Sequence, residues 1–327
     1  MTVTEQNSDV DLAGAIGLLS AAASVTVLCH IQPDADTVGS GLALAIVLER
    51  KGIPVQVAFA RPEKLPDSMG GLPGVHLLVP AAQVNAEVDL LVTVDCGSRG
   101  RLGHLADRFD GARTSLVIDH HRSNTRYAEH NLVDDSAEST TAIIARLLDG
   151  WGVEIDEDIA HCLYAGLVTD TGSFRWVQPG THLLAERLID TGIDSTAIAR
   201  RLLDTHPFGW LPMLSSVLGS AQLVPESADG LGLVYALLRF EDTVGMRSEE
   251  IESVIDIVRT TSEAEVAAVL KETAPGQWSV SLRSKAAVDV SAVAGRLGGG
   301  GHRFASGYTA EGDSEYVVAG LLGALSD

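Results

Sequence analysis

Short apolar runs alternate with longer amphipathic segments along the first two hundred residues of the chain. Buried strands are expected at residues 25–29, 54–60, 88–94 and 114–118, with a loop at 33–36. Helical spacing of apolar positions predicts helices at 12–23, 37–51, 138–150, 156–169, 181–190 and 195–203. Strands that alternate with helices across short loops indicate an α/β fold with a mostly parallel sheet flanked by helices.

The pattern changes after a segment at residues 206–224 that Pro207, Pro212 and Gly219 interrupt. Beyond it, strands are expected at 231–240, 265–272 and 278–283 and helices at 249–258, 290–297 and 316–325, with a glycine run at 298–301. We therefore predict a first domain at 1–205, a connector at 206–224, and a smaller C-terminal α/β domain with a mixed sheet at 225–327. The apolar face of the connector suits either a homodimer interface or packing between the domains.

Composition narrows the class of protein. The chain has 327 residues, a hydrophobic content of 46% and a formal net charge of −21. Such a charge argues against long duplex nucleic acid, whose binding requires arrays of Lys and Arg, but it allows short anionic substrates. The three cysteines are scattered, which predicts free thiols in a reducing compartment. The N-terminus is acidic and lacks signal-peptide character, and no apolar run is long enough to cross a membrane. We therefore expect a cytoplasmic protein without membrane segments.

Carboxylate and imidazole side chains gather where the expected strands and one helix end. Ligands bind at the carboxyl edge of parallel sheets, so these side chains are expected to meet there. Carboxylates that share one edge repel each other, and oxygen-rich sets with some imidazole favour Mn²⁺ or Mg²⁺ over structural Zn²⁺. The candidates are His30, Asp34, Asp36, Asp95, Asp119, His120, His121 and Asp170.

In their order, these motifs resemble the DHH phosphoesterase superfamily. The first motif is Asp34-Ala35-Asp36 after His30, the second is Asp95, the third is Asp119-His120-His121 and the fourth is Asp170-Thr171-Gly172. In the C-terminal half, Gly299-Gly300-Gly301-His302 followed by Ala305-Ser306-Gly307 resembles the DHHA1 substrate-binding domain. The resemblance covers nearly the whole chain.

The resemblance implies a role for each residue of the N-terminal motifs. His30, Asp34 and Asp95 would bind one divalent metal, and Asp36, Asp95, His120 and Asp170 a second, with Asp95 bridging. Mn²⁺ is the ion expected first, and Mg²⁺ or Co²⁺ are the alternatives. The two ions would share a hydroxide that attacks phosphorus. Asp119 would orient His120, and His121 would face the phosphate or assist the leaving group. Ser98 and Asn124 are weaker candidates, because capping and turn roles explain them equally well.

The C-terminal candidates suit an anion. Gly299, Gly300 and Gly301 let backbone N–H groups approach a phosphate closely, and cationic or polar side chains lie near them in sequence. We expect the substrate to contact both domains, with its scissile phosphate on the metals. The remaining candidates for substrate binding are Arg283, Ser284, Lys285, His302 and Ser306.

Within the superfamily, the chain resembles the NrnA-type nano-RNases. Exonucleases that act on long strands would need further nucleic-acid-binding modules, and membrane-bound cyclic-dinucleotide phosphodiesterases carry transmembrane segments. Neither feature is visible in this sequence. The resemblance implies hydrolysis of short oligoribonucleotides and linear dinucleotides, and of 3′-phosphoadenosine 5′-phosphate or cyclic di-AMP in some relatives. The alternatives are a family II-type inorganic pyrophosphatase and a non-catalytic nucleotide-binding regulator.

Overall fold

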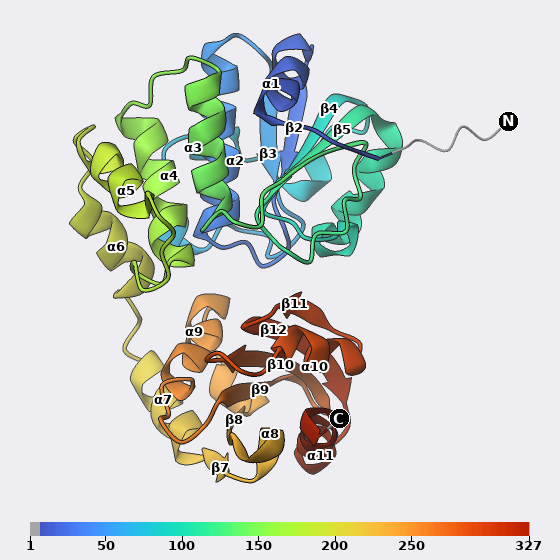
Figure 1. Cartoon of the computed structure of the whole chain (residues 1–327), viewed down its shortest axis with the longest axis vertical. Coiled ribbons are helices and arrows are strands. Elements are labelled where there is room, and N and C mark those ends of the chain that lie inside the picture. The colour runs from blue at the N-terminus through green and yellow to red at the C-terminus, as the bar shows by residue number, and fades with distance from the viewer. Residues whose placement is uncertain (1–6, 327) are drawn as a thin grey trace, which may run out of the picture. The chain divides into compact units, whose positions relative to one another are not determined.

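A computed structural model of the chain describes residues 7–326 (Figure 1). The chain divides into two compact units, of which the first ends at Thr205 and the second begins at His206. Each unit has its own sheet and its own hydrophobic core.

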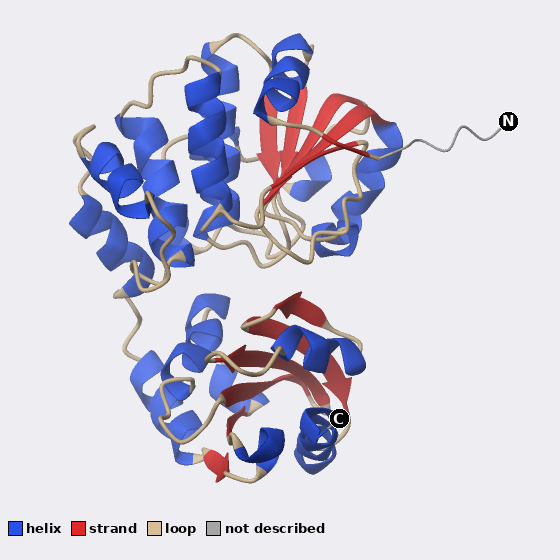
Figure 2. Ribbon diagram, viewed as in Figure 1, coloured by secondary structure: helices blue, strands red, loops and turns tan. Residues whose placement is uncertain are grey.

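A six-stranded, fully parallel sheet forms the centre of the first unit (Figure 2). Its order is β1-β6-β5-β4-β2-β3. The parallel α/β fold expected from the sequence is therefore confirmed. The strands are β1 (Ser8–Asp9), β2 (Val25–Leu28), β3 (Val55–Ala58), β4 (Val88–Val94), β5 (Ala112–Asp119) and β6 (His130–Val133).

Alternating side chains divide the two faces of this sheet. Leu90, Val92 and Val94 of β4 enter the larger core with the helices, whereas Leu91 enters a smaller core closed by 3-10 segments. The helices are α1 (Leu12–Ala21), α2 (Ala35–Arg50), α3 (Thr140–Gly150), α4 (Glu157–Asp170), α5 (Thr181–Ile189) and α6 (Ser195–Leu203). The 3-10 segments are η1 (Asp67–Met69), η2 (Val75–Leu77), η3 (Ala81–Gln83) and η4 (Arg99–Gly111).

Strand order reverses between β2 and β4, because the chain continues from β2 outward to β3 but from β4 outward to β5 and β6. In open α/β sheets, this reversal leaves a crevice beyond the carboxyl ends of the two central strands. His30 lies two residues after β2, and Asp95 directly follows β4.

Two details of the first unit differ from the sequence-based expectation. Helix α2 begins at Ala35 rather than at residue 37, because the Asp34 side chain accepts hydrogen bonds from the N–H groups of Asp36 and Thr37. The expected loop at 33–36 was therefore wrong in its second half. Strands β1 and β6 were not expected, since both are short and carry polar residues.

The second unit has a mixed sheet in the order β11-β12-β10-β9-β8-β7, in which only the β8–β9 pair is parallel. Helices α7 and α9 pack on one face, and α8, α10 and α11 pack on the other. The strands are β7 (Gln222–Val224), β8 (Leu233–Leu238), β9 (Val266–Ala274), β10 (Gln277–Ser284), β11 (Gly300–His302) and β12 (Ala305–Glu311). The helices are α7 (Trp210–Gly219), α8 (Ser227–Gly230), α9 (Ser248–Val258), α10 (Val290–Arg296) and α11 (Ser314–Ser326), with a 3-10 turn η5 (Phe240–Thr243).

The mixed sheet was expected, but β7, β11 and β12 were not, and half of the expected connector is the helix α7. Met213, Leu214 and Val217 of that helix are buried in the core that it shares with β8 and α9. Among residues 7–326, no helix combines the length and apolar character that crossing a membrane requires.

Candidate metal centre

Asp95 lies at the centre of the cluster that the sequence predicted. It directly follows β4, is 3% exposed, and has the left-handed φ of 55°. Its two oxygens face different imidazoles, because His30 Nε2 lies 3.4 Å from Oδ2 and His120 Nε2 lies 3.5 Å from Oδ1. A carboxylate placed in this way can bridge two cations.

One possible ligand group surrounds Oδ2 of Asp95. His30, Asp34 and Asp95 each offer an atom, and these atoms lie within 4.8 Å of one another. Asp34 uses Oδ1 to cap α2, while its Oδ2 lies 3.5 Å from His30 Nε2. One carboxylate thus begins the helix and also faces the cluster.

A second group contains Asp36, His120 and Asp170, again within 4.8 Å. His120 Nε2 lies 3.1 Å from Asp170 Oδ2, and His120 Nδ1 lies 3.2 Å from the carbonyl oxygen of Ala137. A backbone carbonyl at Nδ1 favours a proton there and leaves Nε2 as the electron-pair donor.

Sequence reasoning missed the residues that hold Asp36. The N-terminus of α3 donates to both of its oxygens, from Thr140 N to Oδ2 at 2.7 Å and from Thr141 N to Oδ1 at 2.9 Å. The Thr141 hydroxyl also donates to Oδ1, and the Thr140 hydroxyl donates to Asp95 Oδ1. The run Ser139-Thr140-Thr141 signals only a helix start, so the long-range contacts were not visible in the sequence.

Close packing of α2 on α4 brings Asp36 and Asp170 together. A Cβ at Gly39 would lie 2.4 Å from the carbonyl oxygen of Cys162, and one at Gly166 would lie 2.6 Å from Asp36 Oδ1. Both glycines are therefore required by the approach of the two helices. The start of α2 and the end of α4 meet beside His120.

Asp119 serves a different histidine from the one expected. Its Oδ1 lies 2.7 Å from His121 Nδ1, and its Oδ2 accepts a hydrogen bond of 2.5 Å from Asn124 Nδ2. The expectation that it orients His120 is therefore not met, since the ring nitrogen Nδ1 of His120 faces Ala137 instead. Asn124, which the sequence left as a weaker candidate, is 7% exposed and fixes this carboxylate.

The carboxylates dominate the electrostatics of the cluster. Burial alone would lower the pKa of His120, but the hydrogen bond and charge of Asp170 raise it to about 11. Burial likewise opposes protonation of His30, and Asp34 with Asp95 raises its pKa to about 10. Burial and neighbouring negative charges raise the pKa of Asp170 to about 6.

This donor set fits divalent cations. It combines carboxylate oxygens with imidazoles that coordinate metal in their neutral form, and it contains no thiolate. Such a set suits Mn²⁺ or Mg²⁺ better than a structural zinc. Cations would also remove the mutual repulsion of these carboxylates, of which Asp36 and Asp95 are buried. The two groups that share Asp95 are thus the candidate sites for two ions.

The second unit places Arg283 and His302 in register on one sheet face. Ala305 of β12 pairs with Arg283 of β10 on one side and with His302 of β11 on the other. Paired residues on adjacent antiparallel strands point to the same face. Burial lowers the pKa of Arg283, whose guanidinium also lies near the charges of Asp256 and Glu252.

The other side chains expected to contact substrate form hydrogen bonds within the second unit. The Ser284 hydroxyl donates to Val288 O, and the Ser306 hydroxyl donates to Val290 O and is 7% exposed. Lys285 Nζ donates to the carbonyl oxygens of Thr261 and Ser262.

The glycine run also has a packing role. A Cβ at Gly299 would lie 2.1 Å from Gly307 O, and one at Gly301 would lie 2.6 Å from Ala305 O. Only Gly300 has open space at this position among these three residues. Strand pairing therefore accounts for two of the three glycines, whatever they bind.

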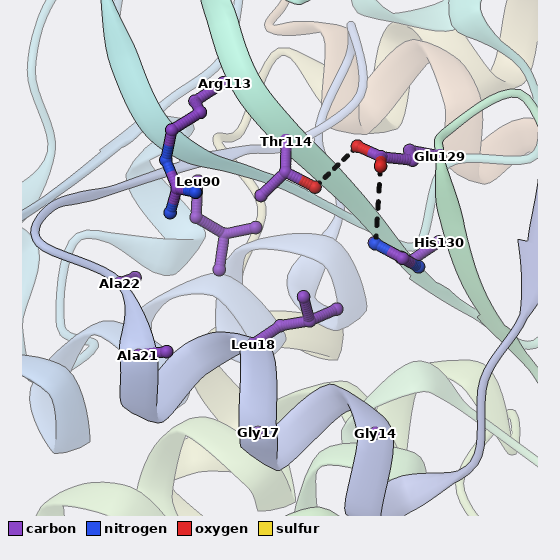
Figure 3. A pocket seen from close by; sticks show the side chains of 10 residues that line it. All are labelled: Gly14, Gly17, Leu18, Ala21, Ala22, Leu90, Arg113, Thr114, Glu129 and His130. Atoms are coloured by element: carbon purple, nitrogen blue, oxygen red, sulfur yellow. Dashed lines mark hydrogen bonds and ion pairs between the residues drawn. The ribbon is translucent and has the colours of Figure 1, made fainter. Parts of the chain in front are cut away.

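A groove of about 510 Å³ lies at a different part of the first unit (Figure 3). Helix α1 lines it with small residues, and Arg113 and Thr114 at the start of β5 face it. Thr114 Oγ1 donates to Glu129 Oε2, and His130 Nε2 lies 3.7 Å from Glu129 Oε1. These residues lie at the amino ends of the strands, so the groove is separate from the acidic cluster.

Family models match both units of the chain. The model of the DHH family, N-terminal domain, matches residues 24–167, and that of the DHHA1 domain matches residues 232–320. The chain is 27% identical over 294 residues to the bifunctional oligoribonuclease and PAP phosphatase NrnA of Thermus thermophilus, covering 88% of this chain and 84% of that one. The protein of the same name from Bacillus subtilis is 27% identical over 288 residues, covering 85% and 86%.

A solved structure shares the fold. The crystal structure of an exopolyphosphatase-related protein from Bacteroides fragilis has a TM-score of 0.86 and 22% sequence identity. The match covers 96% of this chain and 95% of that chain.

Proposed function

Because the chain belongs to the DHH family and is a phosphoesterase of that family with a DHHA1 domain, we propose that it hydrolyses short oligoribonucleotides and linear dinucleotides to mononucleotides. Its further substrates would be 3′-phosphoadenosine 5′-phosphate and cyclic di-AMP. The reaction would depend on two divalent metal ions, with Mn²⁺ the preferred one, and would take place in the cytoplasm.

The position of Asp95 carries this proposal. Its two oxygens face His30 and His120, and a further carboxylate stands beside each imidazole. His30, Asp34 and Asp95 would hold one ion, and Asp36, Asp95, His120 and Asp170 the other. When bound, two such ions activate water and neutralise charge on the phosphate.

The other residues of the cluster would orient one another and protonate the leaving group. Asp119 holds His121 through Nδ1 at 2.7 Å, so Nε2 is the ring atom that can face a substrate. Burial opposes the charge on this imidazole, but the hydrogen bond to Asp119 raises its pKa. His121 is therefore suited to donate a proton to the leaving oxygen.

Residues of the second unit would bind the part of the substrate that does not react. Arg283 and His302 share a sheet face, and an arginine fork matches phosphate oxygens. The backbone of Gly299, Gly300 and Gly301 can add N–H donors, whereas the internal bonds of Ser284, Lys285 and Ser306 suit them to shaping the site.

A substrate panel with metal-free and Mn²⁺-loaded protein tests the proposal. We expect rapid hydrolysis of a 5′-phosphorylated diadenylate, loss of turnover on chelation and recovery with Mn²⁺. Preference for inorganic pyrophosphate would favour the pyrophosphatase alternative. Binding of the diadenylate without turnover of any ester would instead favour a regulatory protein.

A further inference from the structure

Arg101 is a cation that lies against the acidic cluster and has no role in the sites described above. It belongs to η4, six residues after Asp95, and its side chain is exposed. Its Nη2 lies 2.9 Å from His30 Nδ1. The guanidinium therefore stands beside the ring whose other nitrogen faces Asp34 and Asp95.

The backbone places Arg101 there independently of its side chain. Its carbonyl oxygen accepts a hydrogen bond of 2.8 Å from Ile31 N, the residue after His30. Two residues further on, Gly103 has a φ of 59°, and a Cβ there would lie 3.0 Å from Ile31 Cγ2 and 3.1 Å from Ala60 Cβ. A larger residue would push η4 away, so glycine keeps Arg101 against the carboxyl end of β2.

His30 does not provide a hydrogen-bond acceptor for Arg101. His30 Nδ1 lies 2.8 Å from Ile31 O and 2.9 Å from Arg101 Nη2. A ring nitrogen either donates or accepts, and arginine only donates, so Nδ1 can satisfy one of these two partners at a time. Histidines that bind metal through Nε2 usually donate from Nδ1 to a carbonyl or carboxylate. Because Nδ1 carries a proton both in a charged ring and in a ring with metal on Nε2, it donates to Ile31 O, and the Arg101 guanidinium needs another acceptor.

We propose that this acceptor is a non-bridging oxygen of the substrate phosphate, which makes Arg101 a phosphate-binding residue of the active site. The inference rests on the proposed phosphoesterase function. The planar guanidinium can bond two oxygens of one phosphate at once. Its charge would strengthen binding of the ground state and would offset the negative charge that develops during phosphoryl transfer.

The test uses the full chain with Arg101→Gln and Arg101→Lys. Arg113→Gln is the matched control, because it also removes one cation from the first unit but lies in the groove at the opposite edge of the sheet. Three quantities are measured: Mn²⁺ affinity, the Kd of inorganic phosphate for the Mn²⁺-loaded protein, and kcat/KM for a 5′-phosphorylated diadenylate.

In Arg101→Gln, loss of a charge-assisted hydrogen bond should raise the phosphate Kd about 10-fold or more and lower kcat/KM about 10- to 100-fold. Arg101→Lys should lie between it and wild type, because ammonium cannot bind two oxygens in a fork. Added guanidinium should partly rescue Arg101→Gln. Mn²⁺ affinity should not fall in any variant, and Arg113→Gln should match wild type throughout.

Two results would overturn the proposal. One is an unchanged phosphate Kd in Arg101→Gln. The other is a fall in Mn²⁺ affinity that excess Mn²⁺ corrects together with the activity, since Arg101 would then act only through His30. If wild type cleaves no phosphoester yet binds phosphate in an Arg101-dependent way, the proposed function fails while the phosphate site stands.

Discussion

Loading the metal-free protein with Mn²⁺ should release at least about two protons per chain near pH 8, because both imidazoles of the candidate sites are charged without metal. Carboxylates raise the pKa of His30 to about 10 and that of His120 to about 11. A raised pKa keeps each ring protonated until the pH passes that value. Metal coordination requires the neutral ring, so each bound proton must leave.

The number of protons released distinguishes these two histidines from histidines with an unperturbed pKa. An imidazole with an unperturbed pKa of about 6.5 is only about 3% protonated near pH 8, so two such rings would release less than about 0.1 proton. At that pH the Asp170 carboxyl, with a pKa of about 6, is almost fully ionised and adds little. Asp36, whose pKa is raised by burial and by the charge of Asp170, can only add to the total.

Calorimetric titration with Mn²⁺ in two buffers of different ionisation enthalpy measures the released protons. His130→Asn is a suitable control, because His130 starts β6 away from the cluster, and it should leave the proton count unchanged. Release of fewer than about one proton per chain would refute the reasoning, since the imidazoles would then be neutral before metal binds.

Two further predictions concern the chemistry and the binding of substrate. Asp95→Asn keeps the shape of the side chain but removes the shared charge, and we expect weaker Mn²⁺ binding and a kcat lowered at least about 10³-fold, with the fold retained by circular dichroism. Near-normal kcat would show that Asp95 does not bridge. Arg283→Ala or His302→Ala should raise KM for a 5′-phosphorylated diadenylate roughly 10- to 150-fold without changing Mn²⁺ affinity. A small generic phosphodiester should be little affected by either change, and equal damage to both substrates would contradict a role in binding the non-reacting part.

The sequence predicted the parallel sheet and the strands of its centre well, because β2, β4 and β5 are mostly buried, rich in apolar residues, and closely followed or ended by polar ones. It failed where the apolar signal was short or diluted. In β12, Ser306, Tyr308 and Ala310 alternate toward the core, but the intervening glycine and threonine conceal the period.

For the site, the sequence identified residue types but not partners. The hydrogen bonds from Thr140 and Thr141 to Asp36 join positions 104 and 105 residues apart. No local pattern reports such a contact, because each threonine is also an ordinary residue for the start of a helix. The contact of Asp119 with His121, two residues away, is local instead, and the Asp-His-His triplet alone does not show which of the two rings turns toward the carboxylate.

Gly166 offers a test of how helix packing forms the second metal group. A Cβ at this position would lie 2.5 Å from Thr141 Cγ2, 2.6 Å from Asp36 Oδ1 and 2.8 Å from Asp36 Cα, so Gly166→Ala must move α4 away from α2. Overpacking of this kind costs about 1–3 kcal/mol of unfolding free energy.

The matched control is Gly17→Ala in α1, where a Cβ meets nothing within 4 Å and where alanine should stabilise the helix by about 0.5–1 kcal/mol. Because Asp36 and Asp170 lie on the two helices that would separate, Gly166→Ala should weaken the ion held with His120 more than the ion held by His30 and Asp34. Urea unfolding of the metal-free protein gives the first quantity, and Mn²⁺ titration followed by electron paramagnetic resonance gives the second. Equal weakening of both ions would mean that α4 does not set the second group independently, and unchanged binding would mean that the end of α4 is not part of the metal centre.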